Sequence, residues 1–119
     1  MTFNNERAIY LQLADRLCDE ILAGVLAEEG RVPSVREYAA LLQVNVNTAM
    51  KAYESLAREE IIFNRRGMGY FVSPGAKALI HQKRRRIFLE ERVPEFVAEM
   101  RLLDISIADV REAIERSQA

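Results

Sequence analysis

The chain has 119 residues, 50% of them hydrophobic and 29% charged, and a formal net charge of −1 at pH 7. This length allows one compact core with an accessory element, but not two ordinary domains of about 100–150 residues each. The composition excludes a disordered chain. No apolar run approaches the roughly 20 residues that cross a bilayer and no leader segment is recognisable, so we expect a cytoplasmic protein without membrane contact.

The cysteine and histidine content argues against a metal or disulfide site. Cys18 and His81 are the only residues of their types, which excludes an internal disulfide and a Cys/His metal site within one chain. The sequence also lacks a phosphate-binding loop before a helix. We therefore expect no cofactor, no metal and no enzymatic activity. Cys18 flanks an apolar stripe, which favours a buried structural thiol over a reactive one.

The first predicted helix covers residues 9–26, where apolar side chains recur at intervals of three and four residues. Gly24 suits the left-handed position at the end of this helix. The apolar stripe consists of Tyr10, Leu13, Ala14, Leu17, Ile21 and Val25.

A second helix is predicted to begin after Ser34, which can form a capping box with Glu37. The three residues before it should be extended because a proline, Pro33, disfavours helical geometry in its predecessor. Arg36 faces outward in the first turn, either as an ordinary solvated residue or as a contact to DNA. The inward side is expected to consist of Val35, Tyr38, Ala39 and Leu42.

A third helix is predicted to begin after Asn45, a strong N-cap residue. Two helices joined by so few residues must cross steeply, as in a helix-turn-helix, whose second helix enters the major groove. On the outer face, Asn47 can pair with the edge of adenine, and Thr48 and Lys51 suit phosphate. The inward stripe is Ala49, Ala52, Tyr53 and Leu56, and the outer face also carries Met50 and Glu54.

Two short β-rich runs, residues 61–64 and 70–72, predict a hairpin. Its glycines allow positive φ at the tip. A basic tip of this kind can enter a narrow minor groove, although a solvated turn is the alternative. The tip residues are Arg65, Arg66, Gly67, Met68 and Gly69.

The break at residues 73–75 predicts a boundary between a winged helix-turn-helix domain, residues 7–75, and a helical tail, residues 76–119. In the tail, Pro94 should kink or restart the helix, and Ser106 should cap a last helix together with Asp109. The basic run at residues 83–86 is either a solvated face or a phosphate contact.

The tail contains too much aliphatic surface to form a domain alone, which predicts packing on a second copy in a homodimer. The residues expected at this interface are Leu79, Ile87, Phe88, Phe96, Val97, Met100, Leu103, Val110 and Ile114.

Charge gives a mixed indication about nucleic acid, because DNA-binding proteins usually carry a surplus of basic residues. Residues 1–75 contain eight Lys/Arg and ten Asp/Glu, and residues 76–119 contain nine and eight. The basic residues of the first part fall in the proposed reading elements, so a basic face on an acidic body is expected, with low non-specific affinity.

Three ordered motifs resemble the signature of the GntR family of bacterial transcription regulators. They are residues 29–39 (EGRVPSVREYA), residues 44–56 (VNVNTAMKAYESL) and residues 66–72 (RGMGYFV). The resemblance covers roughly Tyr10 to Val72. The short tail and the Asn-x-Asn-Thr turn resemble the YtrA-like branch, whose tail dimerises and is too small for the effector pocket of other branches.

The resemblance implies a mainly α fold with a small β-hairpin, a dimer on an inverted-repeat operator, and usually repression. Gln43 and Glu60 replace glycines common after helices, at a cost of about 1–2 kcal/mol each if left-handed. Val46, Met50 and Met68 replace residues that are often polar, which implies a different base preference. The residues expected at double-stranded DNA are Ser34, Arg36, Asn45, Asn47, Thr48, Lys51, Arg65, Arg66, Gly67, Met68 and Gly69.

A protein-docking module without DNA binding is the alternative function, because winged helices also serve as interaction domains and this chain is slightly acidic. The arginines of the hairpin tip and the exposed Asn47 favour DNA. Whether a small effector binds is left open by the sequence.

Overall fold

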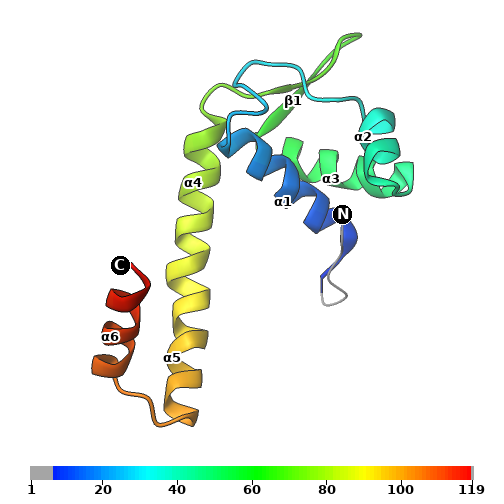
Figure 1. Cartoon of the computed structure of the whole chain (residues 1–119). Helices are drawn as coiled ribbons and strands as arrows, with labels where there is room; N and C mark the ends of the chain where they lie inside the picture. Colours follow the sequence, from blue (N-terminus) through cyan, green and yellow to red (C-terminus); the bar gives the residue numbers. More distant parts are fainter. Residues whose placement is uncertain (1–6, 119) are drawn as a thin grey trace. The chain divides into compact units, whose positions relative to one another are not determined.

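The computed structural model describes residues 7–118 and confirms a mainly helical fold with a two-stranded antiparallel hairpin (Figure 1). In chain order, the elements are α1 Ile9–Leu22, α2 Val35–Leu42, α3 Val46–Arg58, β1 Ile62–Arg65, β2 Gly69–Val72, α4 Ala76–Ile87, the π-helical segment η1 Phe88–Arg92, α5 Val93–Leu102 and α6 Ile107–Ser117.

Helix α1 buries Leu13, Ala14, Leu17 and Ile21 of the predicted stripe in a core shared with α2 and α3, and Tyr10 is partly buried against that core. Cys18 is buried with that stripe, as expected. The prediction for Val25 was wrong, because this side chain is 72% exposed. The helix ends at Leu22, and Gly24 adopts φ 81°, which turns the chain away from the helical path before Val25.

The capping box at the start of α2 is confirmed. The Glu37 N–H donates to Ser34 Oγ at 3.1 Å, and the Ser34 N–H donates to Glu37 Oε1 at 3.3 Å. The side-chain and backbone hydrogen bonds to Ser34 lower the pKa of the Glu37 carboxyl. All four predicted inward residues of α2 are buried.

The turn between α2 and α3 is closed by a left-handed residue and a side-chain cap. Gln43 has φ 56°, and the Asn47 N–H donates to Asn45 Oδ1 at 2.7 Å. Glu60, after α3, is also left-handed with φ 63°, so both conformations anticipated from the sequence are present. The buried Tyr53 hydroxyl donates to the Pro33 carbonyl at 2.6 Å and ties α3 to the segment that enters α2.

The hairpin pairs residues 62–65 with residues 69–72, and Gly67 and Gly69 adopt positive φ as predicted. The Met68 N–H donates to the Arg65 carbonyl at 2.8 Å and closes the tip. On the other edge of β2, the extended segment before α2 adds backbone hydrogen bonds, including one from the Val32 N–H to the Tyr70 carbonyl at 2.9 Å. The hairpin is therefore joined to the entrance of α2.

The chain divides into two compact units between His81 and Gln82, inside α4. Ala76 and Ile80, in the first turns of α4, are buried in the core of the first unit, whereas the boundary expected from the sequence precedes α4. The Lys77 N–H donates to the Glu28 carboxylate at 3.1 Å, which caps the start of α4 from a distant part of the chain.

In the second unit, the backbone remains helical from α4 through η1 into α5. The predicted restart at Pro94 is confirmed: a π-turn, in which the Val93 N–H donates to the Phe88 carbonyl, is followed by α5 with Pro94 in its first turn. A wider turn just before a proline accommodates the missing N–H. The capping box of Ser106 and Asp109 at the start of α6 is confirmed, with N–H to oxygen distances of 3.1 and 3.0 Å.

Candidate nucleic-acid interface

The N-terminal half of α3 presents a polar face, and the opposite side of the helix is packed in the core. The four predicted inward residues of α3 are buried, which directs Asn47 and Lys51 outward, and both are exposed. Thr48 is half-buried beside them. Asn45 lies in the same place, but its side-chain oxygen already accepts the Asn47 N–H, so it acts as a cap. The side chains of Asn47 and Lys51 are therefore accessible to a ligand at the start of α3.

Lys51 has a partner that sequence reasoning missed. Its Nζ lies 5.0 Å from the centroid of the Tyr10 ring on α1, within the range of a cation–π contact. The ring holds the ammonium on the α1 side of the reading face. Tyr10 sits in the predicted apolar stripe, so the sequence indicated packing for it and gave no sign of this role.

The start of α2 contributes one exposed cation. Arg36 lies in the first turn of α2 and is exposed, on the side opposite the buried residues. Ser34 is half-buried, and its hydroxyl accepts the Glu37 N–H. Of these two predicted contacts, Arg36 therefore has its charged group available on the surface, whereas Ser34 serves the cap.

Arg65 lies over an aromatic pair on one face of the hairpin. Its guanidinium carbon is 4.6 Å from the Phe71 ring centroid and 5.7 Å from the Phe63 centroid. The two rings stack with centroids 6.0 Å apart. Residues 63 and 65 share a strand face and residue 71 faces residue 63, so this alternation was a readable signal that sequence reasoning did not use.

The hairpin tip itself is open. Arg66, Gly67 and Met68 are exposed, and residues 62–72 contain no acidic side chain. Arg31, which sequence reasoning did not select, lies beside this tip: a Cβ built on Gly69 would be 3.8 Å from Arg31 Nε. A third arginine therefore joins Arg65 and Arg66 near the tip.

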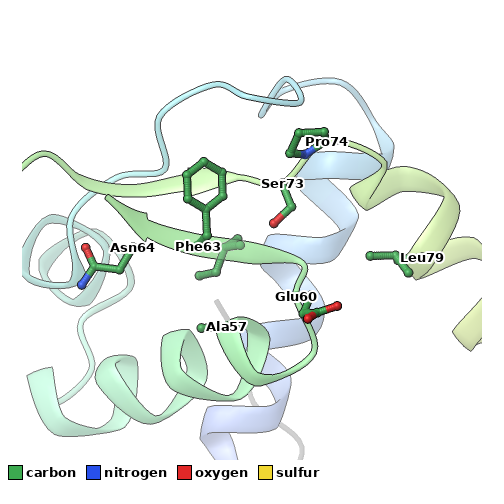
Figure 2. Close-up of a pocket in the computed structure, with 8 residues that line it drawn as sticks. Ala57, Glu60, Phe63, Asn64, Ser73, Pro74 and Leu79 are labelled. Carbon is green, nitrogen blue, oxygen red and sulfur yellow. The ribbon is translucent and has the colours of Figure 1, made fainter. Parts of the chain in front are cut away.

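An open groove of about 540 Å³ lies beside strand β1 of the hairpin (Figure 2). Its lining comes from the end of α3, β1, the segment after β2 and the first part of α4. The lining is mixed in polarity, and within residues 7–118 no group of three or more His, Cys, Asp or Glu could hold a metal ion. The lining residues are Ala57, Glu60, Ile62, Phe63, Asn64, Ser73, Pro74 and Leu79.

The predicted interface residues of the tail lie on its surface. No residue of η1, α5 or the described α6 is buried. Within this unit, a mainly apolar groove of about 490 Å³ runs between Phe96 and α6, lined also by Ile105, Val110 and Ile114. Exposed members of the predicted set are Leu79, Phe88, Phe96, Leu103 and Ile114, and half-buried members are Ile87, Val97, Met100 and Val110.

No helix within residues 7–118 has the length and apolarity required to traverse a bilayer.

Most of the first unit matches a known protein family. Residues 9–72, more than half of the chain, match the family described as bacterial regulatory proteins, gntR family. The matched region contains α1, α2, α3 and the hairpin.

Individual relatives extend the match into the tail. The chain is 31% identical to the HTH-type transcriptional regulator YhcF of Bacillus subtilis, over 94% of this chain and 91% of that protein. It is 29% identical to the HTH-type transcriptional repressor YtrA of the same organism, over 93% and 85%. A candidate GntR-family regulator from Bacteroides thetaiotaomicron, known from its crystal structure, is 50% identical to this chain in sequence. The match covers 90% of this chain and 94% of that one, with a TM-score of 0.79. The chain therefore belongs to the GntR family, with YtrA-type relatives, and is a DNA-binding transcriptional regulator with a winged helix-turn-helix fold.

Proposed function

We propose that the protein represses transcription by binding an inverted-repeat operator as a homodimer. Each copy places the start of α3 in the major groove and the hairpin tip, Arg65–Gly69, in the adjacent minor groove. The observation that carries this proposal is the face of α3 on which Asn47 and Lys51 stand exposed while the opposite face is core.

The assignment of roles follows from chemistry and placement. Asn47 offers both an acceptor and a donor, which suits the N6/N7 edge of adenine, and this pairing gives about 1–3 kcal/mol of discrimination. We assign Lys51 and Arg36, which are exposed cations beside Asn47 and at the start of α2, to phosphate contacts that fix the orientation of the helix. Asn45 supports the reading turn through its cap.

The hairpin suits a narrow groove because its tip is small and basic. Gly67 and Gly69 remove side-chain bulk, and Arg65, Arg66 and Arg31 supply positive charge nearby. A narrow minor groove has enhanced negative potential that attracts arginine.

Dimerisation is supported by the surface of the second unit. Phe96 and Ile114 line the same apolar groove and are each about half exposed, as is Phe88, and exposed apolar surface of this kind suits a protein partner. Two-fold symmetry of the protein then corresponds to an inverted repeat in the operator. Repression is inferred from the relative YtrA, which is a transcriptional repressor.

Selection of bound sequences from a random duplex pool by the full chain tests the proposal. The expected result is a two-fold symmetric consensus whose half-sites are separated by a helical turn or more. A consensus without symmetry would overturn the dimeric arrangement. Recovery of no consensus at low salt, where phosphate contacts are strongest, would overturn specific DNA binding.

A further inference from the structure

The reading face of α3 contains two apolar side chains that are not part of the buried core and remain partly exposed. Val46 and Met50 are each 37% exposed, although the buried stripe of the same helix is almost completely covered. They are four residues apart, so they lie one above the other on one side of the helix. Together they form an apolar strip beside the exposed Asn47.

The position of this strip follows from its neighbours. Met50 precedes Tyr53 by three residues, which places both on the same side of α3, and the Tyr53 hydroxyl donates to the Pro33 carbonyl just before α2. Lys51 points the other way, toward Tyr10 on α1. The strip therefore lies on the side of Asn47 that faces the entrance of α2, where Arg36 is exposed.

The major groove offers one apolar feature to such a strip. The thymine C5 methyl group projects into this groove, whereas the other recognition groups there are hydrogen-bond donors and acceptors. We propose that Val46 and Met50 read thymine methyl groups next to the base contacted by Asn47. This inference rests on the proposed function, because it requires α3 to occupy the major groove. It adds a preference for A·T pairs oriented with thymine toward the strip.

Single exposed apolar residues are normal on protein surfaces, so exposure alone does not indicate that a residue binds a ligand. The distinguishing features here are the one-turn spacing of the pair and its place on the polar face of α3 between Asn47 and the start of α2. Neither side chain has a hydrogen-bond donor, and the only acceptor is the weak thioether sulfur of Met50, so apolar contact is the main way in which they favour a base pair.

Replacement of thymine by deoxyuridine in the selected operator tests the inference directly. Deoxyuridine keeps the base pairing and the O4 acceptor and removes only the methyl group. In each operator variant, one thymine is replaced at the equivalent position of both half-sites. The Kd of the full chain is then measured for each variant. At one or two positions we expect affinity to fall about fourfold for each methyl group lost from contact.

Variants then assign the effect to residues. Met50→Ala and Val46→Ala should each bind the thymine operator more weakly, and each should lose the sensitivity to deoxyuridine at one position. Val25→Ala is the matched control, because Val25 is a more exposed apolar residue outside α3, and it should retain full sensitivity. Alanine is a good helix former, and thermal melts establish that each variant is folded.

The outcomes separate this inference from the proposed function. Wild-type binding that is unchanged by every deoxyuridine replacement would overturn the methyl reading and leave operator binding intact. Sensitivity that persists equally in Met50→Ala and Val46→Ala would also overturn it. Failure to select any operator would instead count against the proposed function.

Discussion

The guanidinium of Arg65 lies 4.6 Å from the centre of the Phe71 ring, diagonally across the hairpin. Gly69, opposite Arg65, has no side chain, so the arginine can lie along the strand surface. An arginine held in this way is already ordered before it meets DNA, which reduces the conformational entropy lost on binding.

We predict that Phe71→Leu weakens operator binding through Arg65. Leucine retains apolar volume but removes the aromatic face, whose exposed cation–π contact contributes about 0.5–1 kcal/mol, so Kd should rise about two- to fivefold. Fluorescence anisotropy on a labelled operator measures this change. In an Arg65→Ala background the same substitution should have little further effect. A full additional loss in that background would show that Phe71 acts independently of Arg65.

Asn47 and Lys51 should respond differently to truncation. Asn47→Ala is expected to relax preference at one base pair per half-site, at a cost of about 1–3 kcal/mol. Lys51→Ala should weaken binding to all sequences equally and lower the slope of log K against log salt by about 1 per half-site. Binding titrations over a salt series, on the operator and on single-base variants, distinguish the two patterns. A uniform loss for Asn47→Ala would make it a phosphate contact.

The left-handed turn at Gln43 offers a stabilising substitution. Glycine removes the Cβ repulsion at φ 56°, although it loses more entropy on folding, so Gln43→Gly should raise the free energy of unfolding by about 0.5–1 kcal/mol. Urea unfolding followed by circular dichroism measures the change. Gln43→Ala retains the Cβ and serves as the control, for which we expect no gain in the free energy of unfolding. Equal stability of the two variants would show that the backbone strain is negligible.

The capping box of α2 should give stability that depends on pH. Hydrogen bonds to Ser34 lower the pKa of Glu37, so the folded state favours the ionised carboxylate. This contribution is fully present above the unfolded-state pKa of about 4.3 and is lost as pH falls through the lower folded-state pKa. The free-energy difference between wild type and Glu37→Gln, measured by urea unfolding, should therefore shrink below about pH 4.3. A constant difference across that range would contradict the ionic contribution.

The tail should control assembly without affecting the fold of the first unit. Phe96→Glu places a charge in the apolar groove of the second unit, and we expect it to shift sedimentation from dimer to monomer and to weaken operator binding strongly. Glu99→Gln, on the exposed surface of the same helix, is a mild control. Unchanged sedimentation of Phe96→Glu would place the interface elsewhere.

Features that depend on neighbouring residues in the chain were predictable from the sequence. The caps at Ser34, Asn45 and Ser106 use side-chain oxygens that reach the backbone two or three residues away, so the local residue pattern is sufficient. The apolar spacing of α2 and α3 also identified their buried faces, because helical periodicity fixes which residues share a side. Three ordered motifs then indicated the family.

Features that depend on distant residues required the tertiary structure. The ring of Tyr10 meets Lys51 only after α1 and α3 pack, and Arg31 comes near Gly69 only after the segment before α2 pairs with β2. The extension of the first unit into α4 likewise depends on burial against elements distant in sequence. Local pattern thus determined the caps and the buried faces of α2 and α3, whereas packing decided where Lys51 and Arg31 are held, because their contacts join residues that are far apart in the sequence.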